Sequence, residues 1–181
     1  NQDEALTLLD NIYVSDINKS ALKQYKSSLQ VFALECWNII LDDKYFNAHI
    51  GTGLLIDVTA EKLEYIPLNR VFDKKIVKKG FDIVATNPPY KNLKAEKGHY
   101  SHEEDYEIDK KKYSSISKIV SKTFKYATVG VLNLYKLFVE EIIDRYANED
   151  AFVSLLIPSS ILSDKTCERL RTHILCDSSL L

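Results

Sequence analysis

The residues Asn87, Pro88, Pro89 and Tyr90 form the stretch of this chain whose types and spacing best suit chemistry. An asparagine side chain carries one carbonyl acceptor and one NH2 donor, and each proline fixes φ and removes a backbone N–H. The stretch therefore offers carbonyl acceptors with few competing donors, next to the flat ring of Tyr90. Such a set suits the grip on a planar amino group, as on a base extruded from a duplex. The alternative is a turn that ends a strand and exposes a tyrosine.

The elements that must position these residues can be read from the apolar pattern. Short apolar runs predict strands, and apolar residues at helical spacing predict helices. The predicted strands cover residues 11–15, 47–50, 81–86 and 151–157, and the predicted helices cover 21–33, 133–146 and a segment capped by Asp164. The apolar run Leu54–Val58 extends the second strand or opens a new element. The stretch Lys91–Gly130 is polar and weakly periodic, which predicts a long functional loop.

Strands that alternate with helices predict an α/β fold with a mostly parallel sheet. In such sheets, ligands bind beyond the carboxyl ends of the strands. Polar groups follow three of the predicted strands, namely Asp16, the turn Gly51-Thr52-Gly53, and Asn87 with its prolines. This coincidence is the main functional signal of the sequence.

The composition excludes several classes of protein. The chain has 181 residues, a formal net charge of −2 and three cysteines without a CxxC pair, so we expect neither a disulfide framework nor a thiolate zinc site. The cysteine pattern leads us to expect a reducing, cytoplasmic compartment. No apolar run approaches the ~20 residues that span a bilayer and no signal peptide opens the chain, so we expect no membrane contact. The absence of methionine and the two abrupt ends lead us to expect a fragment.

The charge is unevenly distributed along the chain. Residues Arg70 to Lys125 contain 14 Lys/Arg and 8 Asp/Glu, and this stretch also carries several tyrosines. Basic side chains interleaved with aromatic ones suit a phosphate backbone and unstacked bases. Because part of this stretch directly follows Tyr90, we expect some residues of Lys91–Lys125 to contact nucleic acid. The alternative is a solvated lysine-rich surface.

At this point the sequence resembles a known family. FDIVATNPPY is similar to motif IV of the amino-group methyltransferases, which has the pattern (N/D)PP(Y/F), and NIYVSDINKSAL is similar to their motif II. LNLYKLFVEEIIDRY followed by AFVSLLIPSSIL resembles the helix, strand and Pro-Ser-Ser turn after motif IV in restriction–modification adenine methyltransferases. The resemblance points to the γ-type N6-adenine enzymes, some of which are fused to a nuclease.

The resemblance implies a Rossmann-like, mostly parallel sheet that uses S-adenosyl-L-methionine. Residues 1–181 would form a partial catalytic domain: motif II near 11–17, motif III near 47–57, motif IV at 87–90, the basic loop at 91–130, and a helix and strand at 133–158. The first strand, its Gly-rich motif and the target-recognition domain would be missing. Cofactor contacts are implied for Asp16 (ribose), Ile17 (adenine ring), Thr52 or Asp57 (adenine amino group) and Asn87.

The implied reaction moves a methyl group to the N6 amino group of an adenine flipped out of double-stranded DNA. The Asn87 side-chain oxygen and the Pro88 carbonyl accept hydrogen bonds from N6, Pro89 stiffens the turn, and Tyr90 stacks on the base. No metal is required, and the four histidines show no ligand spacing. The implied partners are DNA, a target-recognition domain and a nuclease, fused or separate. We expect the fragment alone to be inactive.

Three alternatives remain open from the sequence. The NPPY quartet also occurs in enzymes that methylate a glutamine side-chain amide in release factors, and an amide poses the same problem as an adenine amino group. Methylation of RNA adenine or guanine is a further alternative. The third is a non-catalytic module that binds DNA or partner subunits.

Overall fold

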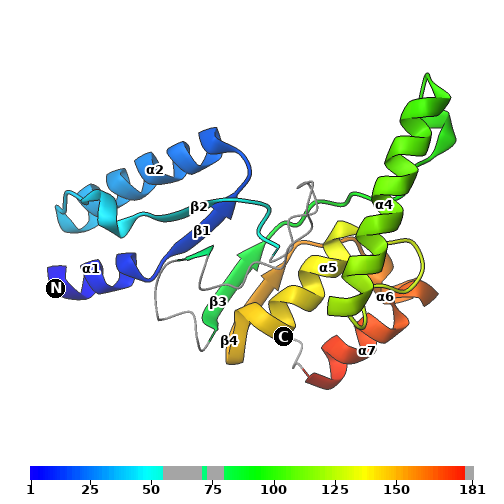
Figure 1. The fold of residues 1–181 in the computed structure, drawn as a ribbon. Coiled ribbons are helices and arrows are strands. Elements are labelled where there is room, and N and C mark those ends of the chain that lie inside the picture. The colour runs from blue at the N-terminus through cyan, green and yellow to red at the C-terminus, as the bar shows by residue number, and fades with distance from the viewer. Residues whose placement is uncertain (55–70, 73–79, 178–181) are drawn as a thin grey trace. The chain divides into compact units, whose positions relative to one another are not determined.

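The computed structural model describes residues 1–54, 71–72 and 80–177, which belong to two compact units (Figure 1). The first unit holds residues 1–54 and 71–72, and the second holds residues 80–177. Each unit contains one pair of parallel strands together with helices, so the expectation of a mixed α/β chain with parallel strands is confirmed within each unit.

Within residues 1–54, the first unit has two α-helices and one strand pair. Its elements are α1 (Gln2–Asp10), β1 (Tyr13–Asp16), α2 (Lys19–Trp37), a 3-10 turn η1 (Asp43–Tyr45) and β2 (Asn47–Ile50). Helix α1 was not expected, although its start carries a capping box: the Asn1 side chain accepts from the Glu4 N–H at 2.9 Å. Apolar residues from both helices and from the segment after α2 form the core, namely Ala5, Leu9, Leu29, Ala33, Ile39 and Leu41.

Strands β1 and β2 pair in parallel, with Tyr13 opposite Asn47 and Asp16 opposite Ile50. The predicted strand 47–50 is confirmed, and the one predicted at 11–15 is shifted to Tyr13–Asp16. Helix α2 starts where the side chain of Asn18 accepts from the Ser20 and Ala21 N–H groups, and it ends at Asn38, whose φ of 54° breaks the helix. The chain thus turns sharply at the carboxyl end of β1.

The second unit holds the longer run of elements. They are β3 (Phe81–Thr86), a 3-10 turn η3 (Lys97–His99), α4 (Glu103–Thr123), α5 (Leu134–Glu141), a π-helical turn η4 (Ile142–Tyr146), β4 (Ala147–Leu155), α6 (Ser160–Ser163), a 3-10 turn η5 (Lys165–Cys167) and α7 (Glu168–Asp177). The predicted strand 81–86 and the helical character of 133–146 are confirmed. Strand β4 begins earlier than predicted and ends at Leu155, with Thr86 opposite Leu155 in the register of the pair.

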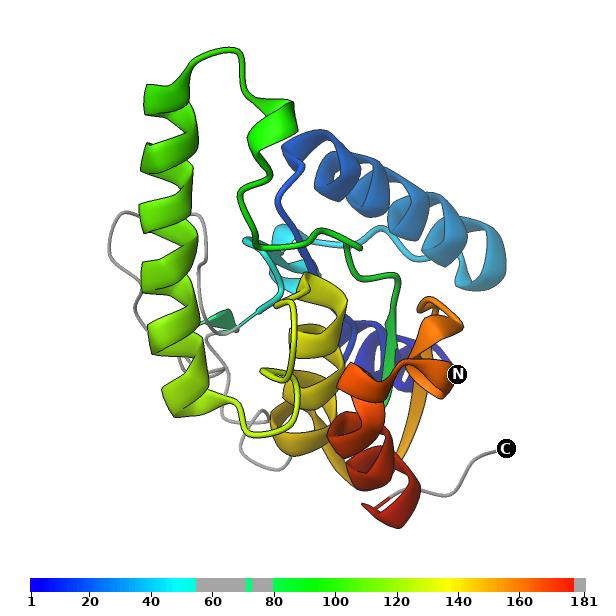
Figure 2. The same ribbon diagram turned by 90° about the vertical axis from the view of Figure 1, so that its right-hand side faces the viewer.

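The prediction of a long loop over Lys91–Gly130 is wrong, because residues Glu103–Thr123 form a 21-residue helix, α4. Its apolar pattern is weak because among its residues only Ile116 and Val120 are buried, so periodicity did not reveal it. Two other signals favour the helix. No glycine or proline interrupts residues 99–129, and the acidic side chains of the first turn interact favourably with the positive N-terminal end of the helix dipole. Figures 1 and 2 show the lower part of α4 beside α5 and its N-terminal part extending past it.

One core cluster of the second unit lies between α5 and the helices that follow β4. It contains the buried residues Tyr135, Val139, Ile161, Cys167 and Leu170. As predicted, Asp164 caps the last helical segment, where its carboxylate accepts from the Thr166 N–H at 2.7 Å. None of the helices in residues 1–54, 71–72 and 80–177 is long and apolar enough to cross a bilayer.

Candidate active site

The quartet Asn87–Tyr90 leaves the second unit's sheet directly after β3. The Leu156 N–H donates to the Thr86 carbonyl at 3.1 Å, so the two strands remain paired up to the point where the quartet begins. Pro88 is buried, whereas Asn87 is exposed and the Tyr90 side chain is half exposed. The structure therefore anchors the turn through Pro88 and leaves the amide and the ring accessible, as an amino-group grip requires.

The hydroxyl group of Tyr90 joins the quartet to the end of β4. Its oxygen lies 2.7 Å from the Leu156 carbonyl oxygen and 3.0 Å from Asn87 Oδ1. A phenol has one proton to donate, so the two acceptors compete for it, and the shorter contact favours Leu156. The hydroxyl thus holds the ring in place and lies beside the oxygen of Asn87, which as a carbonyl acceptor has a second lone pair for a substrate amino group.

A second tyrosine, Tyr135 in α5, lies behind Tyr90 and was missed by the sequence reasoning. The two rings meet edge to face at 6.3 Å between centroids. The Tyr135 hydroxyl lies 3.5 Å from the Cys167 sulfur, and burial, followed by this contact, raises the pKa of Tyr135 to about 12. Tyr135 is two residues after the Asn133 cap of α5, but its contact with Tyr90 depends on the fold.

The chain after Tyr90 is fastened to the start of α5. The Leu93 N–H donates to the Leu132 carbonyl at 2.8 Å, and the Leu134 N–H donates to the Lys91 carbonyl at 2.9 Å. Asn133 both caps α5 and donates from its side chain to Asn92 Oδ1 at 2.7 Å. These bonds hold the chain on the C-terminal side of Tyr90, and the pairing of β3 with β4 holds it on the N-terminal side.

A buried carboxylate holds the turn between α4 and α5. Glu140 is fully buried in α5, and its two oxygens accept from the N–H groups of Lys125, Tyr126 and Ala127 at 2.6, 2.9 and 2.6 Å. Three N–H donors compensate for much of the cost of burying this group. Glu140 thus sets the position in which α4 ends.

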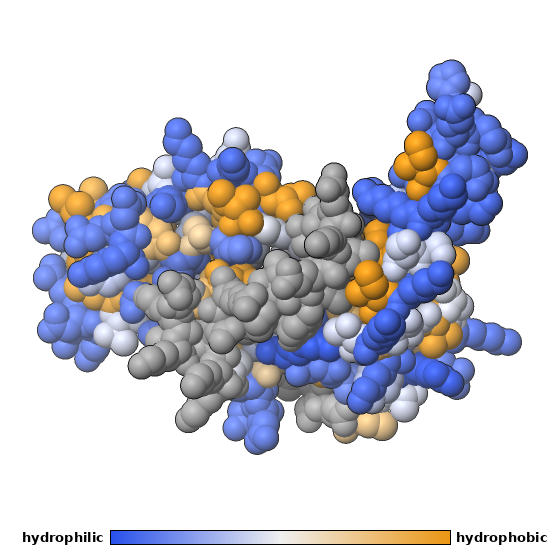
Figure 3. All heavy atoms as spheres, viewed as in Figure 1, coloured by the Kyte–Doolittle hydropathy of each residue, from blue (hydrophilic) through white to orange (hydrophobic). Residues whose placement is uncertain are grey.

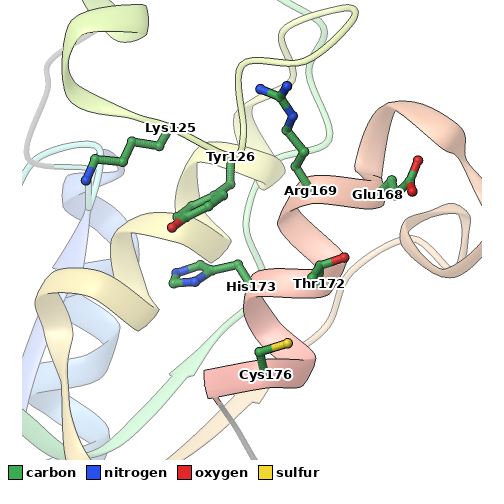
Figure 4. A pocket seen from close by; sticks show the side chains of 7 residues that line it. All are labelled: Lys125, Tyr126, Glu168, Arg169, Thr172, His173 and Cys176. Atoms are coloured by element: carbon green, nitrogen blue, oxygen red, sulfur yellow. The ribbon is translucent and has the colours of Figure 1, made fainter.

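Beside this turn lies a hollow lined by α7 and by Lys125 and Tyr126 (Figure 4). The ring of His173 stacks on Tyr126 at 4.0 Å between centroids, and His173 Nε2 lies 2.7 Å from an Asp144 oxygen. These contacts show that His173 packs the turn against α7. Within the residues that the structure describes, no group of three or more His, Cys, Asp or Glu side chains is arranged to hold a metal ion.

In the first unit, Asp16 is the last residue of β1. One of its carboxylate oxygens accepts from the Asn18 N–H at 2.7 Å, and its backbone carbonyl accepts from Gly51 at 3.1 Å. The next residue, Ile17, is 70% exposed. The second carboxylate oxygen can accept a hydrogen bond from a ribose hydroxyl, and the exposed side chain of Ile17 can contact an adenine ring, so the predicted contacts remain a prediction with suitable groups in place.

The structure gives less support to the other two residues implied to contact the cofactor, Thr52 and Asp57. The Thr52 hydroxyl lies in a local turn, 3.3 Å from the Leu54 N–H and 3.4 Å from the Leu54 carbonyl oxygen. Asp57 lies outside the described residues, as do most of the residues of the run Leu54–Val58. The structure thus describes Asp16, Ile17 and Thr52 in the first unit and the quartet Asn87–Tyr90 in the second.

Nearly the whole sequence is similar to one known protein family. The model of the family described as Eco57I restriction-modification methylase matches residues 10–181. A search of curated proteins and a search of solved structures produced no match. The family match covers nearly all of the chain, including both groups of candidate residues, and it implies a DNA methyltransferase of a restriction–modification system. The chain therefore belongs to the Eco57I restriction-modification methylase family.

Proposed function

We propose that the chain carries the catalytic motif of an enzyme that methylates the N6 amino group of an adenine flipped out of DNA. The observation that carries this proposal is the pairing of Asn87 with Tyr90 at the end of β3: an exposed amide oxygen lies beside a half-exposed ring. The amide oxygen can accept a hydrogen bond from a planar amino group, and the ring can stack on the face of the base that carries this group. The Rossmann-like sheet belongs to the same proposal and is supported by the parallel pairing in each unit.

The methyl donor, S-adenosyl-L-methionine, is implied by the family and by the resemblance of motif II. The residues present fit the nucleoside part, because Asp16 keeps one carboxylate oxygen for a ribose hydroxyl while the Asn18 N–H holds the other. When bound, the donor supplies an electrophilic methyl group. Ile17, exposed beside Asp16, offers an apolar contact for the adenine ring.

The residues of this chain act on the target amine. Asn87 Oδ1 and the Pro88 carbonyl each accept a hydrogen bond from one N–H of the N6 amino group. These hydrogen bonds draw the nitrogen towards tetrahedral geometry and free its lone pair. With its lone pair freed by these acceptors, N6 could take the methyl group that the bound donor would supply, and the nitrogen would then release one proton to water. Because the amine becomes acidic only after attack, no strong base is needed. Tyr90 keeps the base in plane by stacking.

Three variants of the full-length protein test this proposal. Asn87→Ala should abolish incorporation of labelled methyl into DNA while affinity for S-adenosyl-L-methionine stays close to that of the wild type. Asn87→Asp keeps an acceptor oxygen and should retain part of the activity. Asp16→Ala should weaken cofactor binding instead. Methylation at the wild-type rate by Asn87→Ala would overturn the assignment.

The identity of the acceptor needs a separate measurement. Nucleoside analysis of the methylated DNA should find the label in N6-methyladenine. Label in cytosine would remove the adenine assignment and keep the amino-group chemistry. Label in a release factor but not in DNA would favour the glutamine alternative.

A further inference from the structure

Helix α4 divides into two halves of opposite charge. Residues 103–109 contain five carboxylates and no basic side chain, whereas residues 110–123 contain five lysines and no acidic side chain. The visible surface of this helix is mainly hydrophilic (Figure 3). The basic half is therefore a concentrated positive surface, and its value for binding depends on which lysines are already paired.

Two lysines near the N-terminal end of α4 are paired within the chain. Lys97 Nζ lies 2.9 Å from a Glu103 oxygen, and Lys110 Nζ lies 2.8 Å from a Glu107 oxygen. Both ammonium groups also lie over the ring of Tyr106, at 5.9 and 5.3 Å from its centroid. These partners raise the pKa of both lysines. Both ammonium groups thus already have carboxylate partners within the chain.

Three other lysines share one stripe along α4. At about 100° per residue, Lys111, Lys118 and Lys122 fall within roughly 40° of one another, on the side of the helix opposite the buried Val120. At a rise of about 1.5 Å per residue, the stripe is roughly 16 Å long. All three side chains are exposed, and none of the ion pairs among residues 1–54, 71–72 and 80–177 includes them.

The acidic residues Glu104 and Glu107 continue the same face towards the N-terminus. They limit the positive surface to the half that starts at Lys111. The pKa of Glu107 is lowered, first by its hydrogen bond to Lys110 and to a smaller extent by the charge of Lys111, so Glu107 also attracts Lys111. Lys118 and Lys122 are about 6 Å apart along the helix axis. Successive phosphates of one DNA strand are about 3.4 Å apart along the duplex axis, so this spacing is close to that between every second phosphate.

We propose that the stripe Lys111–Lys118–Lys122 of α4 is a contact surface for the DNA phosphate backbone. The proposal rests on DNA as the substrate of this protein and specifies where its backbone binds. The commitment to a polyanion follows from charge complementarity: three exposed lysines on one side of the helix, with no acidic residue from Lys110 to Thr123, face solvent, while the apolar side of the helix packs inwards. Such contacts position the duplex without reading its sequence.

The test compares two double variants of the full-length protein that change the net charge equally. Lys118→Gln/Lys122→Gln removes two stripe lysines, and Lys97→Gln/Lys110→Gln removes two paired ones; glutamine keeps the helix propensity of lysine. Binding to a mixed-sequence DNA duplex is measured between about 50 and 200 mM salt. We expect the stripe variant to reduce the slope of log K against log salt by about 2, and the control to change it by less than about 0.5.

Equal slopes for the two double variants would overturn the proposal, provided that circular dichroism shows both to be folded. Adding Lys111→Gln to the stripe variant should reduce the slope further, and no further reduction would exclude Lys111 from the surface. Binding of an acidic protein, with DNA binding unchanged, would show that the stripe serves a protein partner and would also overturn the proposal.

The outcome can be separated from the fate of the proposed function. If the wild-type protein methylates DNA and the stripe variant behaves as the control, only the location of the contact is wrong. If the wild-type protein neither binds nor methylates DNA, the substrate itself is wrong. Methylation by the stripe variant that recovers at low salt would support both.

Discussion

Replacement of Tyr90 by phenylalanine isolates the hydroxyl group that connects Asn87 to the end of β4. The variant keeps the ring, and with it the edge contact to Tyr135 at 6.3 Å. It loses the contacts at 2.7 Å to the Leu156 carbonyl and at 3.0 Å to Asn87 Oδ1. The variant therefore measures how much methylation activity remains when the ring can still stack on the base but the Asn87 amide no longer contacts a hydroxyl group.

Two effects of the missing hydroxyl oppose each other. Without it, Asn87 Oδ1 has no competing donor, which favours binding of the substrate amino group. The amide also loses the contact that orients it, and a net hydrogen bond contributes about 1 kcal/mol. Because Tyr90 is 50% exposed, water can replace part of this contact. We therefore expect kcat to fall by about 3- to 10-fold, since 1.4 kcal/mol corresponds to tenfold, with KM for DNA unchanged or lower.

Replacement by alanine provides the comparison. Tyr90→Ala removes the stacking face, which contributes about 1–3 kcal/mol per base, so KM for DNA should rise clearly above that of Tyr90→Phe. The assay is steady-state methylation with labelled cofactor over a range of DNA concentrations. A loss of about 1000-fold in kcat for Tyr90→Phe would refute the reasoning, because the hydroxyl would then act in the chemical step. Equal effects of both variants would show that the ring does not stack on the target.

Two further predictions concern the supports of the site. Glu140→Gln should lower the free energy of unfolding by about 2–4 kcal/mol, because the carboxylate that accepts from three backbone N–H groups is lost in a fully buried position. Chemical denaturation measures this change. A change under about 0.5 kcal/mol, the usual range of surface substitutions, would contradict the assigned role. The pKa of Tyr135, raised to about 12, predicts a stability contribution that is complete below the unfolded pKa of 10.0 and is lost as pH rises through the folded value. Tyr135→Phe should reduce this alkaline loss of stability in pH-resolved denaturation, and Tyr100, whose pKa is also raised to about 12 by its hydrogen bond to Asp109, should account for part of what remains. An unreduced loss in the variant would show that Tyr135 does not contribute.

The features that were predictable from the sequence depend on neighbouring residues. Asn87 follows a strand that two prolines must end, and Asp16 follows a short β-branched and aromatic run, so each position could be placed without the fold. The cap at Asp164 is local in the same sense. Each is set by backbone geometry within a few residues.

The features that were missed depend on contacts between distant residues. Tyr135 gains its place behind Tyr90 only when α5 packs beside the end of β3, and Glu140 reaches three N–H groups 13 to 15 residues earlier in the chain. In sequence, Glu140 is one more charged residue of an amphipathic helix. Its burial follows from the turn after α4, whose helix was itself too polar to reveal a periodicity.

The charge of the segment after Tyr90 shows why a count of basic residues is a poor measure of a binding surface. The count treats Lys97 and Lys110 as equal to Lys118 and Lys122, although the first two have carboxylates within 3 Å. Helix formation sorts these lysines: those next to the acidic half have carboxylate partners, and Lys118 and Lys122, about two and three turns after Lys110, do not. Because release of counterions from DNA depends on ammonium groups that reach phosphates, the salt dependence of binding should follow the unpaired stripe of α4 and not the total charge.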